Sequence, residues 1–266
     1  MSDILTKILS QKHLEVAQLD CAALRRAAEA SPAPRDFLGA LQHPPQPGAP
    51  GLIAELKRAS PSRGLLAPHL DLFEVAELYA ANGAAAISVL TDRKFFLGEL
   101  ETLSELRFTH HCPLPLLRKD FIIDEAQLYE ARASGADAVL LIAAALPDEA
   151  HFAGLHACAL ELGLTTLVEV HDAAEIERSL RLPGLRLLGI NNRNLSTFEV
   201  SLETSERLRP LIPPGITVVA ESAIFNRADV ARLSRARLDA ILVGEALMTA
   251  PDIPARVREL SGKDAQ

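Results

Sequence analysis

The segment Leu52-Ile53-Ala54-Glu55-Leu56-Lys57 is an apolar run that ends in an acidic and a basic side chain. Seven further runs rich in Val, Ile and Leu follow along the chain: Ala85–Leu90, Leu114–Leu117, Ala138–Ile142, Thr166–Val170, Leu187–Ile190, Ile216–Ala220 and Ala240–Val243. Such runs, without polar alternation, are typical of strands that helices bury on both faces. Six of the eight end in, or are closely followed by, acidic, basic or amide residues. This pattern predicts a parallel barrel that carries its chemistry on one rim.

The stretches between the runs predict helices with defined ends. Helix starts are predicted where a polar residue precedes Glu, Gln or Asp by three positions: Asp71, Asp124, Asp172 and Asn226. Helix ends are predicted at left-handed glycines: Gly83, Gly135 and Gly163. The strand starts lie about 22 to 34 residues apart, and eight such strand–helix repeats close a sheet. A doubly wound open sheet is the alternative, but it needs fewer strands and a Gly-rich first turn that this chain lacks.

Chain length favours one α/β domain, a (β/α)8 TIM barrel with an N-terminal helical extension. The chain has 266 residues, against about 250 for a typical barrel, so a second large domain is excluded. We expect residues 1–50 to form the extension and residues 51–266 the barrel. In the extension, apolar spacing from Ile4 predicts an amphipathic helix that continues toward Ala30. The Pro-rich stretch Ser31–Pro50 predicts an irregular strap with one helical turn at Asp36–Leu41. Periodicity does not tell which end of the barrel the extension covers.

Composition excludes several classes of partner. The net charge is -8, which argues against nucleic acid or an anionic membrane. The longest apolar run, Ala138–Leu146, is far shorter than the roughly 20 residues that span a bilayer. The amino terminus does not resemble a signal peptide, so we expect a cytoplasmic protein. Cys21, Cys112 and Cys158 lack zinc-ligand spacing, so we expect reduced thiols and no metal site.

Charged residues at the strand ends are the candidate site residues. Glu55 and Lys57 share one face of the first strand and would both point into the barrel mouth, as a site or as a structural ion pair. Ser60, Ser62 and Gly64 follow in a segment whose composition suits phosphate or a mobile lid. The third strand ends in Arg118-Lys119, of which only one can face inward, and alternation does not tell which.

A carboxylate and two anion-binding candidates come from the later strands. Glu169 stands between Val168 and Val170, where burial would raise its pKa and poise it as a base, unless it merely pairs with an arginine. The sixth strand leads into Asn191-Asn192-Arg193-Asn194, which suits polar substrate groups but also ordinary turns. Because loops after the last two strands of such barrels commonly bind phosphate, Ser222 and Gly244 are anion-binding candidates, unless they are only turn residues. Three Glu and three basic residues make the empty mouth near neutral.

Six ordered motifs together resemble the indole-3-glycerol phosphate synthase family. They cover successive strand ends along the whole chain: Glu55–Ser62, Leu117–Phe121, Leu167–Val170, Gly189–Leu195, Ala220–Ser222 and Leu242–Met248. The resemblance implies ring closure of 1-(2-carboxyphenylamino)-1-deoxyribulose 5-phosphate with loss of carbon dioxide and water, in tryptophan biosynthesis. It implies no metal or organic cofactor, and it implies that the amino-terminal helix lies over the catalytic end. We expect a monomer that acts on this small phosphorylated substrate.

The same resemblance assigns roles to individual residues. Lys119 would be the general acid and Glu169 the base of the dehydration, while Lys57 would pair with the carboxylate; which lysine serves which step stays open. The expected binding residues fall into four groups: Glu55, Asn191 and Glu221 for the sugar hydroxyls; Arg193 for the aromatic carboxylate; Ser60, Ser222, Gly244 and Glu245 for the phosphate; and Phe96, Phe121, Leu195 and Leu242 for the aromatic ring, unless these four only fill the barrel.

Two positions depart from the family pattern, and two other functions stay open. Ala223 stands where the family has Gly, so a positive φ there would strain the site. Leu97 and Glu99 stand where Gln and Ser are expected. A Schiff-base sugar-phosphate aldolase is one alternative, because Lys119 would also serve that chemistry. The other is a non-catalytic phosphate-sugar binder, which would need neither Lys119 nor Glu169.

Overall fold

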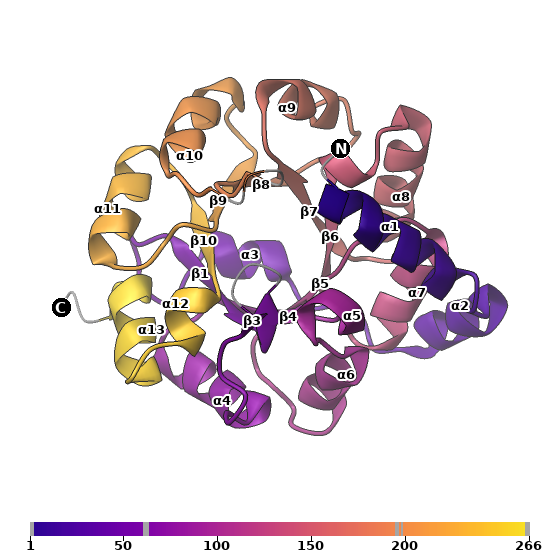
Figure 1. The fold of residues 1–266 in the computed structure, drawn as a ribbon, viewed down its shortest axis with the longest axis horizontal. Coiled ribbons are helices and arrows are strands. Elements are labelled where there is room, and N and C mark those ends of the chain that lie inside the picture. The colour runs from indigo at the N-terminus through magenta and orange to yellow at the C-terminus, as the bar shows by residue number, and fades with distance from the viewer. Residues whose placement is uncertain (1–2, 61–63, 195–196, 198, 264–266) are drawn as a thin grey trace.

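The computed structural model describes residues 3–60, 64–194, 197 and 199–263. Eight parallel strands close into a barrel in the order β1-β10-β9-β8-β7-β6-β5-β4, and β4 pairs back to β1 (Figure 1). The strands are β1 (Gly51–Leu56), β4 (Ala86–Leu90), β5 (Leu116–Lys119), β6 (Ala138–Ile142), β7 (Thr165–Val170), β8 (Leu187–Asn191), β9 (Thr217–Glu221) and β10 (Ala240–Val243). The predicted barrel is confirmed, and its predicted strand limits differ from the observed ones by at most two residues.

Helices surround the barrel and follow the strands in turn. They are α4 (Leu72–Asn82), α6 (Leu100–Phe108), α7 (Glu125–Ala133), α8 (Glu149–Glu161), α9 (Ala173–Ser179), α10 (Glu203–Leu208), α11 (Arg227–Arg235) and α13 (Ile253–Ser261). Shorter elements lie in the connections: β2 (Ala59–Ser60), β3 (Gly64–Leu65), α5 (Arg93–Phe96), η1 (Ala143–Ala145), η2 (Arg209–Leu211) and α12 (Glu245–Met248). The antiparallel pair β2–β3 directly follows β1.

The predicted helix ends are present. The side chains of Asp71, Asp124, Asp172 and Asn226 each accept a backbone N–H of the first turn. The C-cap glycines adopt left-handed φ values of 107°, 84° and 75°: Gly83, Gly135 and Gly163. Only the α7 and α11 starts form the full reciprocal capping box, because the Glu175 side chain of α9 accepts the backbone N–H of His171 instead.

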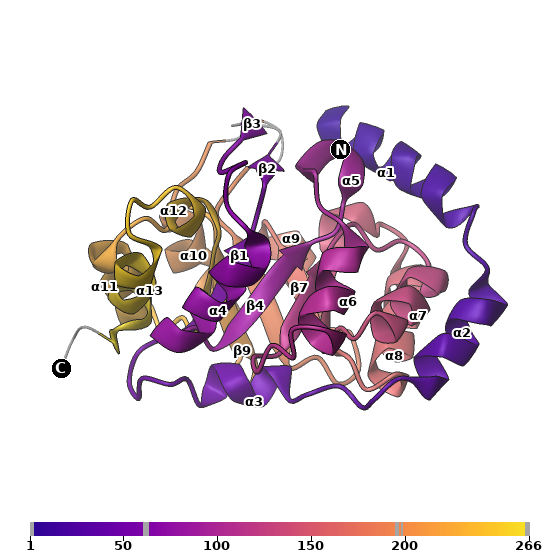
Figure 2. The same cartoon turned by 90° about the horizontal axis from the view of Figure 1, so that it is seen from below.

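Three helices precede β1, and the expected single helix toward Ala30 is wrong. α1 (Asp3–Val16) ends before Asp20, whose side chain accepts the N–H of Ala23 and starts α2 (Cys21–Ala30). The strap then forms the predicted turn as α3 (Phe37–Gln42). Figure 2 shows that α1 lies at the end of the barrel where β2, β3 and α5 lie, whereas α3 crosses the opposite end.

Two apolar clusters fix the direction of each strand side chain. Leu52, Ala54 and Leu56 of β1 belong to the cluster between the barrel and the helices. Ile53 belongs to the inner cluster, which Phe37, Leu38 and Leu41 of α3 and Leu5 of α1 join. The alternation therefore points Glu55 into the barrel. In β5, Leu117 is in the inner cluster and Leu116 in the outer one, so Lys119 faces inward and Arg118 outward.

Candidate active site

A cavity of about 160 Å³ opens at the carboxyl ends of the strands. It is lined by every predicted site residue except Ser60 and Leu195: Glu55, Lys57, Phe96, Lys119, Phe121, Glu169, Asn191, Arg193, Glu221, Ser222, Leu242, Gly244 and Glu245. Ser60 is placed by its backbone in β2, and its side chain is not among the described parts. Leu195 lies outside the described residues. Residues from six strand ends, together with Phe96 of α5, thus meet at one opening.

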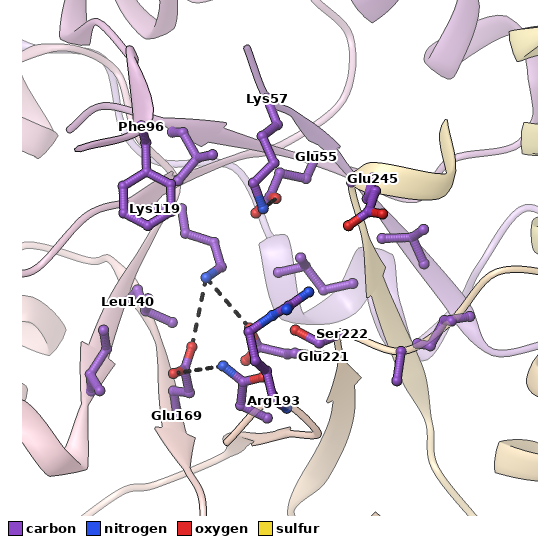
Figure 3. Close-up of a pocket in the computed structure, with 18 of the residues that line it drawn as sticks. Glu55, Lys57, Phe96, Lys119, Leu140, Glu169, Arg193, Glu221, Ser222 and Glu245 are labelled. Carbon is purple, nitrogen blue, oxygen red and sulfur yellow. Dashed lines mark hydrogen bonds and ion pairs between the residues drawn. The ribbon is translucent and has the colours of Figure 1, made fainter. Parts of the chain in front are cut away.

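Lys119 is the central cation of this cavity. Its Nζ lies 3.6 Å from Oε2 of Glu169 and 3.7 Å from Oε2 of Glu221, between the two carboxylates (Figure 3). Burial lowers the pKa of Lys119, but Glu169, Glu221 and Glu55 outweigh burial, so that the pKa is raised above its ordinary value. Lys119 is therefore an ammonium group at neutral pH.

Glu55 and Lys57 form a second ion pair in the same cavity. Lys57 Nζ donates to Glu55 Oε1 at 2.8 Å, and the Glu55 side chain is buried while that of Lys57 is 20% exposed. Burial raises the pKa of Glu55, but Lys57 and Lys119 outweigh it and lower the pKa overall. Both lysines of the cavity therefore lie against at least one carboxylate.

The two inner carboxylates differ in their proton affinity. Glu169 is buried as expected, but the expected rise of its pKa is wrong. Burial alone would raise the pKa, whereas Lys119, His171 and Asn191 together hold it well below the ordinary value. Burial and the negative charge of Glu169 instead raise the pKa of Glu221 to about 8. Glu169 is thus the ionised member of the pair, and Glu221 is the member that retains a proton near neutral pH.

Two glycines make room for these carboxylates. A Cβ on Gly189 would lie 2.1 Å from Oε1 of Glu221, and a Cβ on Gly244 would lie 2.5 Å from Oε1 of Glu55. Both contacts are far too short for real side chains. The predicted anion-binding position Gly244 therefore has a packing reason to be glycine. Gly244 is also the N-cap residue of α12, so the backbone N–H groups of the first turn of this helix follow it directly.

The polar residues after β8 take separate roles. Asn191 donates from Nδ2 to Oε1 of Glu169 at 3.1 Å, and its Oδ1 accepts the backbone N–H of Arg193 at 3.0 Å. Asn192 turns away from the cavity and is buried, where its Oδ1 accepts both the N–H and the hydroxyl of Ser205. Of the two amides, Asn191 belongs to the site and Asn192 fixes the loop.

The turn after β9 has a strained backbone. Ser222 and Ala223 have φ values of 66° and 64°, in the left-handed region that favours glycine. Both residues line the cavity. Ala223 stands where the family has Gly. It has the positive φ that was expected to strain the backbone at this position.

The apolar wall includes residues that sequence reasoning did not assign. The rings of Phe96 and Phe121 lie with centroids 6.1 Å apart. Apolar side chains from β6 and α1 complete the wall: Leu140, Ile142, Ile4, Leu5 and Ile8. The α1 residues follow the amphipathic spacing of the first helix, which was visible in the sequence, although its position over the cavity was implied only by the family resemblance.

Sequence reasoning also did not assign Lys12, which holds α1 to the rim of the cavity. Its buried Nζ lies 2.9 Å from Asp92 Oδ2 and 2.8 Å from Asp120 Oδ1, and both carboxylates are buried. Asp92 caps α5, which carries Phe96, and Asp120 follows Lys119. The cluster therefore ties the covering helix to two sides of the cavity. A lysine at helical spacing gives no sequence signal for such burial.

Across the described ranges, no group of three or more His, Cys, Asp and Glu side chains has the geometry to hold a metal ion. The three cysteines are unpaired. Among the helices described, none has the length and apolar character needed to cross a bilayer.

Comparison with known proteins identifies the family of the chain. The family model described as indole-3-glycerol phosphate synthase matches residues 5–260. The indole-3-glycerol phosphate synthase of Polaromonas sp. (strain JS666) is 48% identical over 268 residues, which cover 99% of this chain and all of the relative. That of Roseiflexus castenholzii is 49% identical over 274 residues, with the same two coverages.

Solved structures share the fold at low sequence identity. KGPDC from Streptococcus mutans has a TM-score of 0.60 at 14% identity and covers 81% of this chain and 96% of its own. A tryptophan synthase alpha-subunit from Pyrococcus furiosus has a TM-score of 0.57 at 17% identity, with coverages of 81% and 98%. At this sequence identity, these structures support the barrel fold and carry no information about the function of the chain. On the family match and the identity to its relatives, the chain belongs to the indole-3-glycerol phosphate synthase family.

Proposed function

We propose that the cavity at the carboxyl ends of the strands carries out the reaction of its family through the residues described above. The chain is a carboxy-lyase of tryptophan biosynthesis. Its reaction converts 1-(2-carboxyphenylamino)-1-deoxyribulose 5-phosphate to indole-3-glycerol phosphate, carbon dioxide and water. The observation that carries the residue assignment is the Lys119 ammonium between Glu169 and Glu221.

Lys119 acts as the general acid of the ring closure. As the aromatic carbon attacks the ribulose carbonyl, the carbonyl oxygen gains negative charge and needs a proton. The Glu169 and Glu55 carboxylates keep Lys119 protonated even where Glu221 holds a proton, and an ammonium group in a partly apolar cavity is well placed to supply a proton to the carbonyl oxygen. Carbon dioxide then leaves from the same aromatic carbon that attacked the carbonyl, and the electron pair of the broken carbon–carbon bond restores the aromatic ring.

Glu169 acts as the base of the later dehydration. Its carboxylate is ionised and buried. Asn191 fixes one of its oxygens, while Oε2, 3.6 Å from Lys119 Nζ, accepts no hydrogen bond from the described part of the chain. Oε2 is thus available for the proton that the intermediate must lose as its hydroxyl departs. Lys57, against Glu55, can pair with the substrate carboxylate or protonate the departing hydroxyl, and the division of these steps between the two lysines is left to kinetics.

The remaining lining residues bind the two ends of the substrate. Arg193 faces the aromatic carboxylate, and Phe96, Phe121 and Leu242 hold the ring. The phosphate lies against the turn at Ser222 and the backbone that follows Gly244, with Ser60 and Glu245 nearby, as in the loops after the last strands of other barrels. Glu55, Asn191 and Glu221 hold the sugar hydroxyls. We also infer a monomeric, cytoplasmic enzyme with no nucleic-acid partner.

The charge on Lys119 disfavours the Schiff-base aldolase. Nucleophilic attack requires a neutral amine, which neighbouring cations or an apolar pocket would favour. Here the neighbours are carboxylates, which raise the pKa of Lys119. Borohydride should therefore trap no substrate on this residue.

The direct test is turnover of the anilino-ribulose phosphate, followed by indole fluorescence. The chain has no Trp and two Tyr, so protein background is small. We expect indole-3-glycerol phosphate to form with wild-type protein. Tight substrate binding without turnover would support the non-catalytic binder instead, and capture of substrate by borohydride would support the aldolase.

A further inference from the structure

His171 follows β7 directly and is held at three points. Its backbone N–H donates to Oε2 of Glu175 at 2.7 Å, and its Nδ1 lies 3.1 Å from the same oxygen. Its Nε2 lies 3.2 Å from Oε1 of Glu169. The side chain is 14% exposed. The ring therefore cannot rotate without losing its contacts to both carboxylates.

The imidazole lies behind the reaction cavity rather than inside it. Glu169 lines that cavity, whereas His171 lines a second one of about 760 Å³. The charged groups that line this second cavity come from α9 and from the segment and helix after β8: Asp172, Glu175, Arg193, Glu199 and Arg207. Lys119 lies beyond Glu169, and the Ala144 and Leu5 side chains add no charge. His171 does not line the reaction cavity itself, and its direct contact with a charged group of that cavity is the one to Glu169.

The two groups that contact the ring are both carboxylates. Burial lowers the pKa of His171, but the adjacent carboxylates of Glu169 and Glu175 outweigh burial and raise the pKa to about 10. The ring is therefore an imidazolium at neutral pH, and it forms an ion pair with Glu169 at 3.2 Å.

Glu169 and Glu221 are equivalent with respect to Lys119 but not with respect to other donors. Lys119 Nζ lies 3.6 Å from one carboxylate and 3.7 Å from the other. Glu169 has two further partners, His171 and Asn191. Both carboxylate oxygens of Glu221 lack a hydrogen-bond partner among the described residues. Two buried carboxylates this close cannot both ionise readily, so the donors around Glu169 decide which one holds a proton.

We propose that His171 is a positioning residue that keeps Glu169 ionised and leaves the proton of the Glu169–Glu221 pair on Glu221. The inference rests on the proposed function of Glu169 as the base. Without the imidazolium, burial, Lys119 and Asn191 set the balance, and Glu169 takes up a proton at higher pH. A protonated Glu169 cannot accept the proton released in the dehydration.

The test compares His171→Phe, which keeps a ring without donors, with His171→Gln, which keeps a neutral donor. Carbon-13 NMR of labelled glutamate carboxyls reads the ionisation of Glu169 without turnover, and Glu169→Gln assigns its signal. The pH profile of kcat/KM reads the base in the reaction. We expect His171→Phe to move both the Glu169 titration and the acidic limb of kcat/KM upward by about one pH unit or more. At pH values below the pKa that this limb reports, kcat/KM of His171→Phe should be about tenfold lower than that of the wild type. The decrease in His171→Gln should be smaller.

A matched control is His151→Gln, in which an outer-layer histidine that contacts the Ile123 carbonyl is replaced. It should change neither readout. If His171→Phe fails to fold, Glu175→Gln removes the support of the ring from its other side and should shift both readouts in the same direction.

The outcomes separate the two ideas. A Glu169 titration that stays unchanged in the His171 variants overturns the inference. A shifted titration with an unshifted kcat/KM limb supports the effect of His171 on the carboxylate but rejects Glu169 as the base. A parallel shift of both supports the two together.

Discussion

The two ends of the barrel treat a buried carboxylate in opposite ways. At the amino end, Asp137 accepts four hydrogen bonds: three from Arg35, through its backbone N–H at 2.6 Å, Nε at 3.0 Å and Nη2 at 2.7 Å, and one from the N–H of Leu116 at 2.7 Å. At the carboxyl end, Glu221 is as deeply buried, yet neither of its oxygens has a hydrogen-bond partner among the described residues. The buried carboxylate at the amino end thus has its hydrogen-bonding capacity filled by the protein, whereas the one at the carboxyl end can still bind a ligand.

The same contrast separates two neighbours within β5. Arg118 faces the helices and is satisfied by Glu130 Oε2 at 2.7 Å and the carbonyl of Gln127 at 2.9 Å. Lys119 faces the cavity, with its carboxylates at 3.6 and 3.7 Å. Tight pairs of the first kind stabilise the fold, while loose pairs of the second kind can exchange partners and protons during a reaction.

The largest effect on stability is expected at the saturated end. Asp137→Asn leaves the Arg35 guanidinium without its carboxylate and places an amide N–H₂ among donors. Breaking a buried pair in this way costs about 3–5 kcal/mol of unfolding free energy. Urea titration should show a lower midpoint with an unchanged slope. A loss below about 1 kcal/mol would mean that the two ends do not differ as described.

The largest effect on chemistry is expected at the other end. Lys119→Met and Glu169→Gln should each lower kcat by about 100-fold or more, while circular dichroism and gel filtration remain those of the wild type. Arg118→Met is the matched control in the adjacent position. It should lower the thermal stability and leave kcat of the folded protein close to normal. Near-normal kcat in both cavity variants would reject the acid and base assignments.

A pH dependence of stability should come from the cavity. The folded-state pKa of Glu221 is raised from 4.5 to about 8, so its contribution to stability is present in full below about pH 4.5 and is lost as pH rises toward 8. The pKa of His171 is raised from 6.5 to about 10, so its contribution to stability is likewise lost as pH rises from the first value to the second. Glu221→Gln should therefore flatten the fall of Tm between pH 5 and 8, and a parallel fall in wild type and variant would contradict this.

A substitution in the turn after β9 should have the smallest effect on stability. Ala223→Gly relieves a left-handed alanine, worth about 1–2 kcal/mol, but makes the unfolded chain more flexible by about 0.4–1 kcal/mol. The net gain in stability is expected to be about 0–1.6 kcal/mol, read from Tm, with a lower KM if the phosphate approaches this turn. Ala236→Gly, at a residue with φ of −80°, should destabilise instead. Equal effects of the two substitutions would argue against strain at Ala223.

Much of this architecture follows from the sequence because its signals are local. Apolar runs, capping residues such as Asp71 and C-cap glycines such as Gly83 act within a few residues of where they stand. The break between α1 and α2 was missed although it is also local, since the cap at Asp20 was outweighed by the apolar spacing around it.

Other features depend on contacts between distant segments. Whether Arg118 or Lys119 faces inward depends on the phase of the closed sheet, which no single strand contains. The direction of the Glu169 pKa depends on Lys119, His171 and Asn191 together, so burial alone predicted it wrongly. The burial of Lys12 depends on Asp92 and Asp120, about 80 and 108 residues further along the chain.

The central claim is that acid, base and phosphate-binding groups from different strands meet around one substrate. A crystal structure of Glu169→Gln with the anilino-ribulose phosphate bound tests this most directly. The account predicts Lys119 Nζ within hydrogen-bond distance of the ribulose carbonyl oxygen and the phosphate on the backbone that follows Ser222 and Gly244. A substrate bound with its carbonyl away from Lys119, or its phosphate away from both turns, would contradict it.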